Sequence, residues 1–289
     1  MANATGGYYV PHHAHWPIVG SVGLTALVVG VANYLNGGGG FWTAMMYGGF
    51  AIVAIMMFGW FRNVIVESES GAYSDQVDVS FRMGMIWFIA SEVMFFAAFF
   101  GALFYARQFA VPWIGGEGSG LSTAQFLWPS FEASWPTNGP KSIGGAFQTI
   151  PAFDLPLINT LILLSSGVTV TAAHHALKKA QRRATVFWLA ATVALGFLFV
   201  FLQAYEYVHA YSDLNLKLST GIYGSTFFML TGFHGMHVTV GAIMLAIITL
   251  RVAKGHFTPD HHFGFEAVAW YWHFVDVVWL GLFVFVYIL

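Results

Sequence analysis

The stretch that decides the fold is His261-His-Phe-Gly-Phe-Glu-Ala-Val-Ala-Trp-Tyr-Trp-His-Phe-Val-Asp-Val-Val-Trp-Leu280. It places a glutamate, a histidine and an aspartate in a run otherwise hydrophobic enough to cross a bilayer, where ionisable groups are costly and usually have a partner or a function. At about 100° per residue, Glu266, His273 and Asp276 fall within roughly a third of the helix circumference. We predict a membrane helix whose polar edge faces protein and whose apolar remainder faces lipid.

The composition extends the membrane prediction to the whole chain. Of 289 residues, 57% are hydrophobic and 8% are charged, whereas soluble domains carry about 25% charged residues. The net charge of −2 provides no basic field for phosphates, so we expect no nucleic-acid partner. The chain has no cysteine, which excludes disulfides, iron–sulfur clusters, thiolate-bridged copper and thioether-linked haem. Residues 1–15 contain no Lys or Arg and no apolar core, so no cleavable targeting segment is predicted there.

Seven runs are long enough to span a hydrocarbon core as helices, which takes about 20 residues each. The predicted spans are residues 16–35, 41–61, 82–107, 155–177, 184–209, 221–250 and 263–288. Several joins between them are short, which favours antiparallel neighbours. The prediction is an all-α integral membrane bundle of seven helices that forms a single membrane domain over residues 1–289.

The distribution of Lys and Arg predicts the orientation, because these residues collect on the inner side. The side of the N-terminus holds eight of them and the opposite side holds three. We therefore expect a multi-pass protein with its N-terminus inside and its C-terminus outside. The eight are Arg62, Arg82, Lys178, Lys179, Arg182, Arg183, Arg251 and Lys254, and the three are Arg107, Lys141 and Lys217.

Two connections are predicted to be longer loops. The inner one, residues 67–79, carries four acidic residues and is expected to contact a partner or the headgroup level. The outer one, residues 112–154, is rich in Gly, Pro and Ser and has no convincing helix or strand period. We interpret the outer loop as a cap over the outer face or as a docking surface, including one for a supercomplex partner.

Glu92 lies near the middle of the third span. Its neighbours one turn away on the same helix are apolar and offer no charged partner, so desolvation favours the protonated carboxyl. Two interpretations stay open. The carboxyl ties two helices together by a hydrogen bond, or it handles protons.

Two further groups of polar residues have both a structural and a metal-binding interpretation, and a third has a structural and a lipid-binding one. Glu206 and His209 have the Glu-x-x-His spacing that di-iron helix bundles use twice, but it occurs only once here. His234 and His237 lie one turn apart in the sixth span. His174 and His175 end the fourth span beside Lys and Arg residues that set topology or hold anionic phospholipid.

Taken together, these motifs resemble subunit III of the aa3-type haem-copper cytochrome c oxidases. The resemblance covers nearly the whole chain and follows the family's order. Its motifs are Trp16-Pro17, Ser91-Glu-Val-Met-Phe-Phe96, Leu155-Pro-Leu-Ile-Asn-Thr160, Ala173-His-His175, Leu202-Gln-Ala-Tyr-Glu206, Thr231-Gly-Phe-His-Gly-Met-His237 and the stretch quoted above.

The resemblance implies a non-catalytic subunit without metal or haem. It would pack mainly on subunit I and also on subunit II, which carry haem a and copper, in a bacterial plasma membrane or the mitochondrial inner membrane. It would bind phospholipids (phosphatidylglycerol, phosphatidylethanolamine or cardiolipin) in a cleft that separates its first two helices from the other five. It would support proton uptake into subunit I and protect the enzyme against inactivation during turnover.

The resemblance also assigns residues. The family's buried carboxyl corresponds to Glu92, and its lipid headgroup contacts correspond to Trp60, Glu67, His237, Arg251, Lys254 and His256. With no further His motif in the chain, we predict that the other buried polar groups form an internal hydrogen-bonded seam between helices. These groups are Glu206, His234, Glu266, His273 and Asp276.

Two other classes of function serve as alternatives. A membrane di-iron oxygenase would use some of the twelve histidines, although the clustered His boxes of such enzymes are missing here. A transporter would use Glu92 in its pathway and would transport its substrate without partner subunits.

Overall fold

The computed structural model describes residues 9–11 and 14–289. All regular secondary structure of these residues is helical. Most of the segment in which no targeting signal was predicted lies outside these residues. The helices are α1 (Trp16–Leu35), α2 (Gly40–Glu69), α3 (Asp75–Tyr105), α4 (Val111–Ile114), α5 (Leu155–Lys178), α6 (Arg182–Ser212), α7 (Gly221–Lys254) and α8 (Phe263–Leu282). Short π or 3-10 turns lie at Ala106–Ala110, Gly118–Gly120, Thr123–Leu127 and Phe283–Ile288.

Seven helices in the described part of the chain are long and apolar enough to cross a membrane. This confirms the predicted number, and each predicted span lies inside one of them. The third span is much longer than predicted, because α3, a π turn and α4 form one helix over Asp75–Ile114.

The prediction of an inner loop over residues 67–79 is wrong, because the connection between the helices is shorter than this. Helix α2 continues to Glu69 and α3 begins at Asp75. Asp75 and Asp78 lie in the first turn of α3, where carboxylates stabilise the positive end of the helix dipole. Asp78 also accepts a hydrogen bond of 2.7 Å from Nε of Arg82 one turn later. Two of the four acidic residues therefore begin α3, and the other two, Glu67 and Glu69, belong to the end of α2.

The chain forms two compact units, Met1–Met83 and Gly84–Leu289. In the first unit, α1 and α2 pack along their length as a hairpin. A Cβ on Gly30 would lie 2.5 Å from the backbone nitrogen of Met46, and a Cβ on Gly49 would collide with the backbone of Leu27. Small residues at both points allow the two backbones to approach closely, as in other membrane helix pairs.

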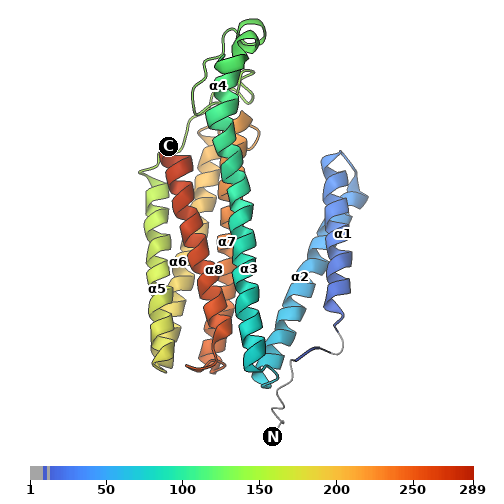
Figure 1. The fold of residues 1–289 in the computed structure, drawn as a ribbon, viewed down its shortest axis with the longest axis vertical. Coiled ribbons are helices and arrows are strands. Elements are labelled where there is room, and N and C mark those ends of the chain that lie inside the picture. Colours follow the sequence, from blue (N-terminus) through green and yellow to red (C-terminus); the bar gives the residue numbers. More distant parts are fainter. Residues whose placement is uncertain (1–8, 12–13) are drawn as a thin grey trace. The chain divides into compact units, whose positions relative to one another are not determined.

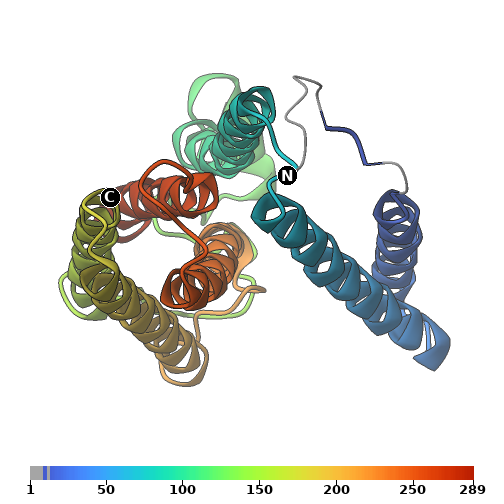
Figure 2. The same ribbon diagram turned by 90° about the horizontal axis from the view of Figure 1, so that it is seen from below.

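In the second unit, α5 packs on α6, α6 on α7, α7 on α8 and α8 on α5, which closes a four-helix ring (Figures 1 and 2). Trp272 and Trp279 of α8 fill its interior and are fully buried. Their indole nitrogens donate hydrogen bonds of 2.8 Å to Oγ of Ser166 and 2.9 Å to Oγ1 of Thr160, both on α5. The ring core is therefore aromatic, and both of these indole nitrogens are paired.

The part of α3 in the second unit packs on α7 and α8 through aromatic side chains. The rings of Phe95 and Phe233 lie 5.0 Å apart, and those of Phe96 and Phe274 lie 6.1 Å apart. The outward faces remain apolar and open, since Val168, Phe201 and Val277 are 70%, 68% and 67% exposed. Such faces are suited to lipid contact.

The outer loop forms more local structure than predicted, because α4 and two of the short turns lie within or beside its first part. The rest is irregular but is tied to the connection between α6 and α7. The amide of Gln148 donates to the carbonyl of Leu214, and Nδ2 of Asn215 donates to the carbonyls of Gly144 and Ala146. The loop thus lies over the end of this helix pair.

Candidate functional site

Six of the nine Lys and Arg residues of the second unit lie at one end of the four-helix ring, together with three histidines. The helices α5 and α7 end there, and α6 and α8 begin there (Figure 1). We call this the basic end. Its side chains are His174, His175, Lys178, Lys179, Arg182, Arg183, Arg251, Lys254 and His256.

Arg182 closes the end of α7. Its Nε donates a hydrogen bond of 3.0 Å to the carbonyl of Val252, and its Nη2 donates to the carbonyl of Ala253. Gly255 ends the helix in the left-handed region with φ of 84°, the usual glycine C-cap. Arg182, Arg183, Val186 and Ala253 line a shallow hollow of about 370 Å³. Two guanidinium groups at one hollow favour an anionic ligand.

The headgroup residues implied by the resemblance occupy different settings in the second unit. The guanidinium carbon of Arg251 lies 4.4 Å from the centre of the Phe257 ring. Lys254 is exposed and His256 is half-buried. All three lie at the basic end. His237 does not, because it is buried and lies in the middle of α7.

In the first unit, Trp60 of α2 is 46% exposed. Glu67, in the last turn of α2, accepts a hydrogen bond of 2.7 Å from the hydroxyl of Tyr73. Burial raises the pKa of Tyr73 above its ordinary value, and the Glu67 carboxylate raises it further. The phenol therefore stays protonated and keeps donating to Glu67.

Glu92 of α3 has a partner that its own helix does not supply. Its Oε2 lies 3.0 Å from Nε2 of His237 on α7, which is the contact between two helices that the first of the two interpretations describes. Nδ1 of His237 lies 2.6 Å from the carbonyl of Phe233, which only accepts, so Nδ1 carries a proton. One more proton then lies between the two side chains, on the carboxyl or on the imidazole Nε2.

Glu206 and His209 do not form the paired metal motif that their spacing allowed. Oε1 of Glu206 accepts hydrogen bonds of 3.0 Å from Gln203 and 2.7 Å from Tyr287. His209 instead donates to Asp213 over 2.7 Å. This bond lowers the pKa of Asp213 below its ordinary value.

His234 is fully buried in the ring core. Its Nε2 lies 3.2 Å from the carbonyl of Val275 and therefore donates to it. Its imidazole lies against the rings of Phe199 and Trp279. Glu206 and His234 thus occupy separate hydrogen-bonded positions and do not share one seam.

The polar edge of α8 lies along α5. Nε2 of His273 is 3.3 Å from Oγ1 of Thr171, and its Nδ1 is 3.6 Å from Oδ2 of Asp276. A Cβ on Gly167 would collide with the Asp276 carboxylate, so this glycine makes room for it. The side chain of His273 is 47% exposed, so this edge is not buried along its whole length.

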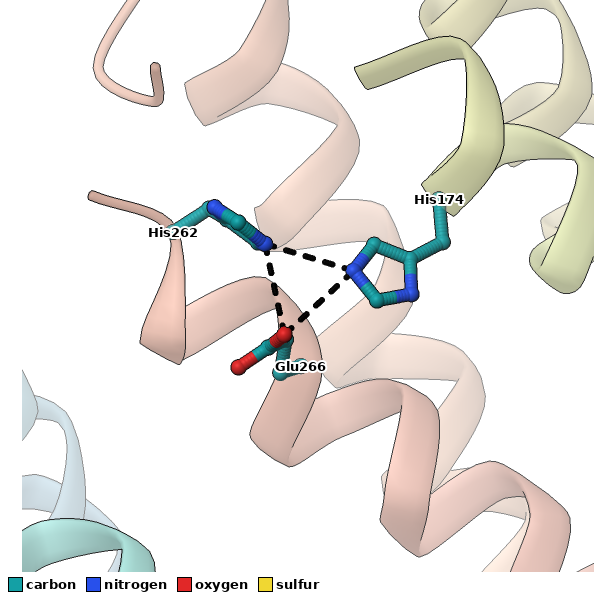
Figure 3. A group of neighbouring side chains, drawn as sticks. All are labelled: His174, His262 and Glu266. Atoms are coloured by element: carbon teal, nitrogen blue, oxygen red, sulfur yellow. Dashed lines mark hydrogen bonds and ion pairs between the residues drawn. The ribbon is translucent and has the colours of Figure 1, made fainter. Parts of the chain in front are cut away.

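Glu266, the third group on this edge, meets two histidines at the basic end (Figure 3). They are His174 from α5 and His262, which immediately precedes α8. Among the described residues, these three form the one cluster of His and acidic ligands spaced to hold a metal ion. The sequence contains part of this signal, since His262 and Glu266 are one helix turn apart. His174 is 88 positions from His262, and only the tertiary structure brings it in.

The chain matches a family of known proteins along almost its whole length. The family model described as cytochrome c oxidase subunit III matches residues 7–289. Curated relatives named cytochrome c oxidase subunit 3 from Gadus morhua, Oncorhynchus masou and Salmo salar are each 39% identical to it over 288 residues. Each of these alignments covers 99% of this chain and 98% of the relative.

Proposed function

Because this chain belongs to the cytochrome c oxidase subunit III family, we propose that its own task in the oxidase is to hold phospholipid at its basic end. The family places it in a respiratory membrane as a multi-pass subunit of the oxidase complex. Members of the family carry no redox centre of their own. Electron transfer to dioxygen therefore belongs to partner subunits, and this chain contributes binding and electrostatics.

The observation that carries the proposal is the gathering of cationic side chains at the basic end. Arg182 and Arg183 line a hollow there, and Arg251 and Lys254 lie in the last turn of α7. Each Lys or Arg near a membrane surface contributes about 1 kcal/mol of attraction to anionic lipid. Apolar helix faces beside them suit acyl chains, so headgroup and tail both find a complementary surface. Trp60 and Glu67 would contact headgroups from the first unit.

We also propose that the basic end faces the inner side of the membrane, as the ratio of eight to three Lys and Arg indicates. Its histidines and bound phosphates would then supply exchangeable protons where subunit I, the main contact in the complex, takes protons up. Lipid at this end would also stabilise the contact and slow inactivation during turnover. The outer loop would cap the opposite end and offer a surface to a further complex.

The test is a pair of double variants of the purified oxidase. In Arg251→Gln/Lys254→Gln, the loss of about 2 kcal/mol corresponds to roughly 30-fold weaker binding of anionic phospholipid. The matched control, Lys141→Gln/Lys217→Gln, removes the same charge from the outer loop and from the connection between α6 and α7, at the opposite end of the helices. Native mass spectrometry counts bound lipids, and repeated oxygen consumption measures the catalytic lifetime.

We expect the first variant alone to lose lipid and to inactivate sooner, with its haem spectrum unchanged. Equal lipid loss in both variants would show that the basic end has no special role. Added anionic phospholipid should restore the catalytic lifetime, and failure of that rescue would separate inactivation from lipid binding.

A further inference from the structure

Three side-chain atoms converge at the basic end from two helices. Nε2 of His174 lies 3.3 Å from Nε2 of His262 and 3.4 Å from Oε1 of Glu266. Nε2 of His262 lies 3.3 Å from the same oxygen. The three atoms therefore form a nearly equilateral triangle, and Figure 3 shows the side chains pointing toward one another.

These separations do not suit direct hydrogen bonds alone. A charged N–H donor to a carboxylate normally approaches to about 2.7–2.9 Å, and both edges of the triangle that end at Glu266 are longer. The edges instead match neighbouring ligands of a tetrahedral metal. With metal–ligand bonds of about 2.05 Å and a tetrahedral angle, the ligand atoms lie about 3.3 Å apart.

From this geometry we propose that His174, His262 and Glu266 bind a divalent transition metal of the zinc class. Two imidazole nitrogens and one carboxylate oxygen suit Zn²⁺, whereas Mg²⁺ and Ca²⁺ prefer sites made of oxygen ligands alone. An ion about 2.05 Å from each atom sits just above their plane, which leaves a fourth position for water or another ligand. The proposal does not rest on lipid binding.

The surroundings hold the three ligands in place. The side chains of His174, His262 and Glu266 are 23%, 8% and 13% exposed, so the site is sheltered yet within reach of the surface. The ring of His174 packs on Phe265, with centroids 5.4 Å apart. His262 and Glu266 are spaced one turn apart at the start of α8, so the same helix turn positions both. A bound ion would thereby link the end of α5 to the start of α8.

Two features limit the affinity of this site for zinc. Lys178 lies in the last turn of α5, four positions after His174. Its positive charge opposes the binding of a metal cation nearby. Nδ1 of His262 is buried without a hydrogen-bond partner in the described part of the chain, and an incomplete second shell costs about 10–100-fold in metal affinity. We therefore expect reversible binding that a strong chelator removes.

The experiment uses the intact oxidase, stripped with a chelator and dialysed against a series of free Zn²⁺ concentrations. Bound zinc per oxidase is then measured by mass spectrometry of the metal. The variants are His174→Gln and Glu266→Gln, which keep polar side chains of similar length. The control is His175→Gln, which changes the adjacent, exposed histidine. Subtraction of the variant from the wild type removes zinc bound to other subunits.

We expect each site variant to bind one zinc ion fewer than the wild type, or to bind it more than 100-fold more weakly. The control should bind as the wild type does. Glu266→Asp, which keeps the carboxylate, should retain part of the affinity and shows that the subunit tolerates a change there. Equal zinc binding in the wild type and both site variants would overturn the proposal and leave a hydrogen-bonded triad only. Subunit retention on gels confirms that each variant is assembled.

Discussion

The indole of Trp272 lies between two glycines, Gly196 and Gly241. This allows a test of how tightly the ring core is packed. A Cβ on Gly241 of α7 would lie 2.9 and 3.0 Å from two atoms of this indole and 3.2 Å from the ring of Tyr271. A Cβ on Gly196 of α6 would lie 2.7 Å from the neighbouring edge of the same indole. Trp272 is fully buried, so its ring cannot move outward to relieve either contact.

The perturbation is Gly241→Ala, with Gly235→Ala in the same helix as its matched control, because a Cβ at Gly235 meets nothing within 4 Å. Replacing glycine by alanine inside a helix favours the folded state by about 1 kcal/mol in both variants. Only Gly241→Ala adds overpacking, which costs about 1–3 kcal/mol. Since the propensity gain is common, the overpacking cost is the expected difference in stability between the variants.

The assay is thermal unfolding of the subunit in detergent, followed by tryptophan circular dichroism, with release from the oxidase as a second readout. On the scale of soluble domains, 1 kcal/mol shifts the midpoint by about 2–4 °C. Gly241→Ala should therefore unfold several degrees below Gly235→Ala, which should match or exceed the wild type. Equal upward shifts in both variants would refute the confinement of Trp272.

Three other predictions concern polar groups and use the same unfolding assay. Glu92→Leu leaves Nε2 of His237 without its hydrogen bond and should lower the stability by about 1–3 kcal/mol. Glu92→Gln can donate to that nitrogen and should lower the stability clearly less. Equal losses of stability in the two variants would contradict the hydrogen bond. Tyr287→Phe removes a donor to the buried carboxyl of Glu206 and should cost about 1–3 kcal/mol. In a Glu206→Gln background its cost should change, and strict additivity would show that the two side chains are uncoupled. Asp213 has a lowered pKa in the folded protein, so it stabilises the fold above the ordinary carboxyl pKa of about 3.9 and loses this contribution as the pH falls through the lower folded value. The midpoint difference between the wild type and Asp213→Asn should therefore be larger near neutral pH than in acid, and a difference independent of pH would contradict this.

Both binding proposals concern the basic end, but neither depends on the other. The hollow at Arg182 and Arg183 suits phosphate, whereas the triangle at Glu266 suits a cation. The lipid variants leave all three triangle ligands intact, and the zinc variants leave all Lys and Arg in place. Failure of one experiment therefore leaves the other unaffected.

The amino-acid sequence by itself determined the number of membrane helices and nearly all of their positions. The reason is local, because a run of about 20 apolar residues can satisfy its backbone in a bilayer only as a helix. The polar edge of the last span was likewise visible, because Glu266, His273 and Asp276 share a face by helical spacing alone.

Only the tertiary structure decided the partners of the polar groups. Glu92 and His237 are 145 positions apart, and His174 and His262 are 88 apart, so no helical period connects them. Apolar patterns between membrane helices leave many packing arrangements open, since lipid and protein are equally apolar. Packing between helices buries Trp272 against its two glycines, and packing between α5 and α8 brings His174 to Glu266.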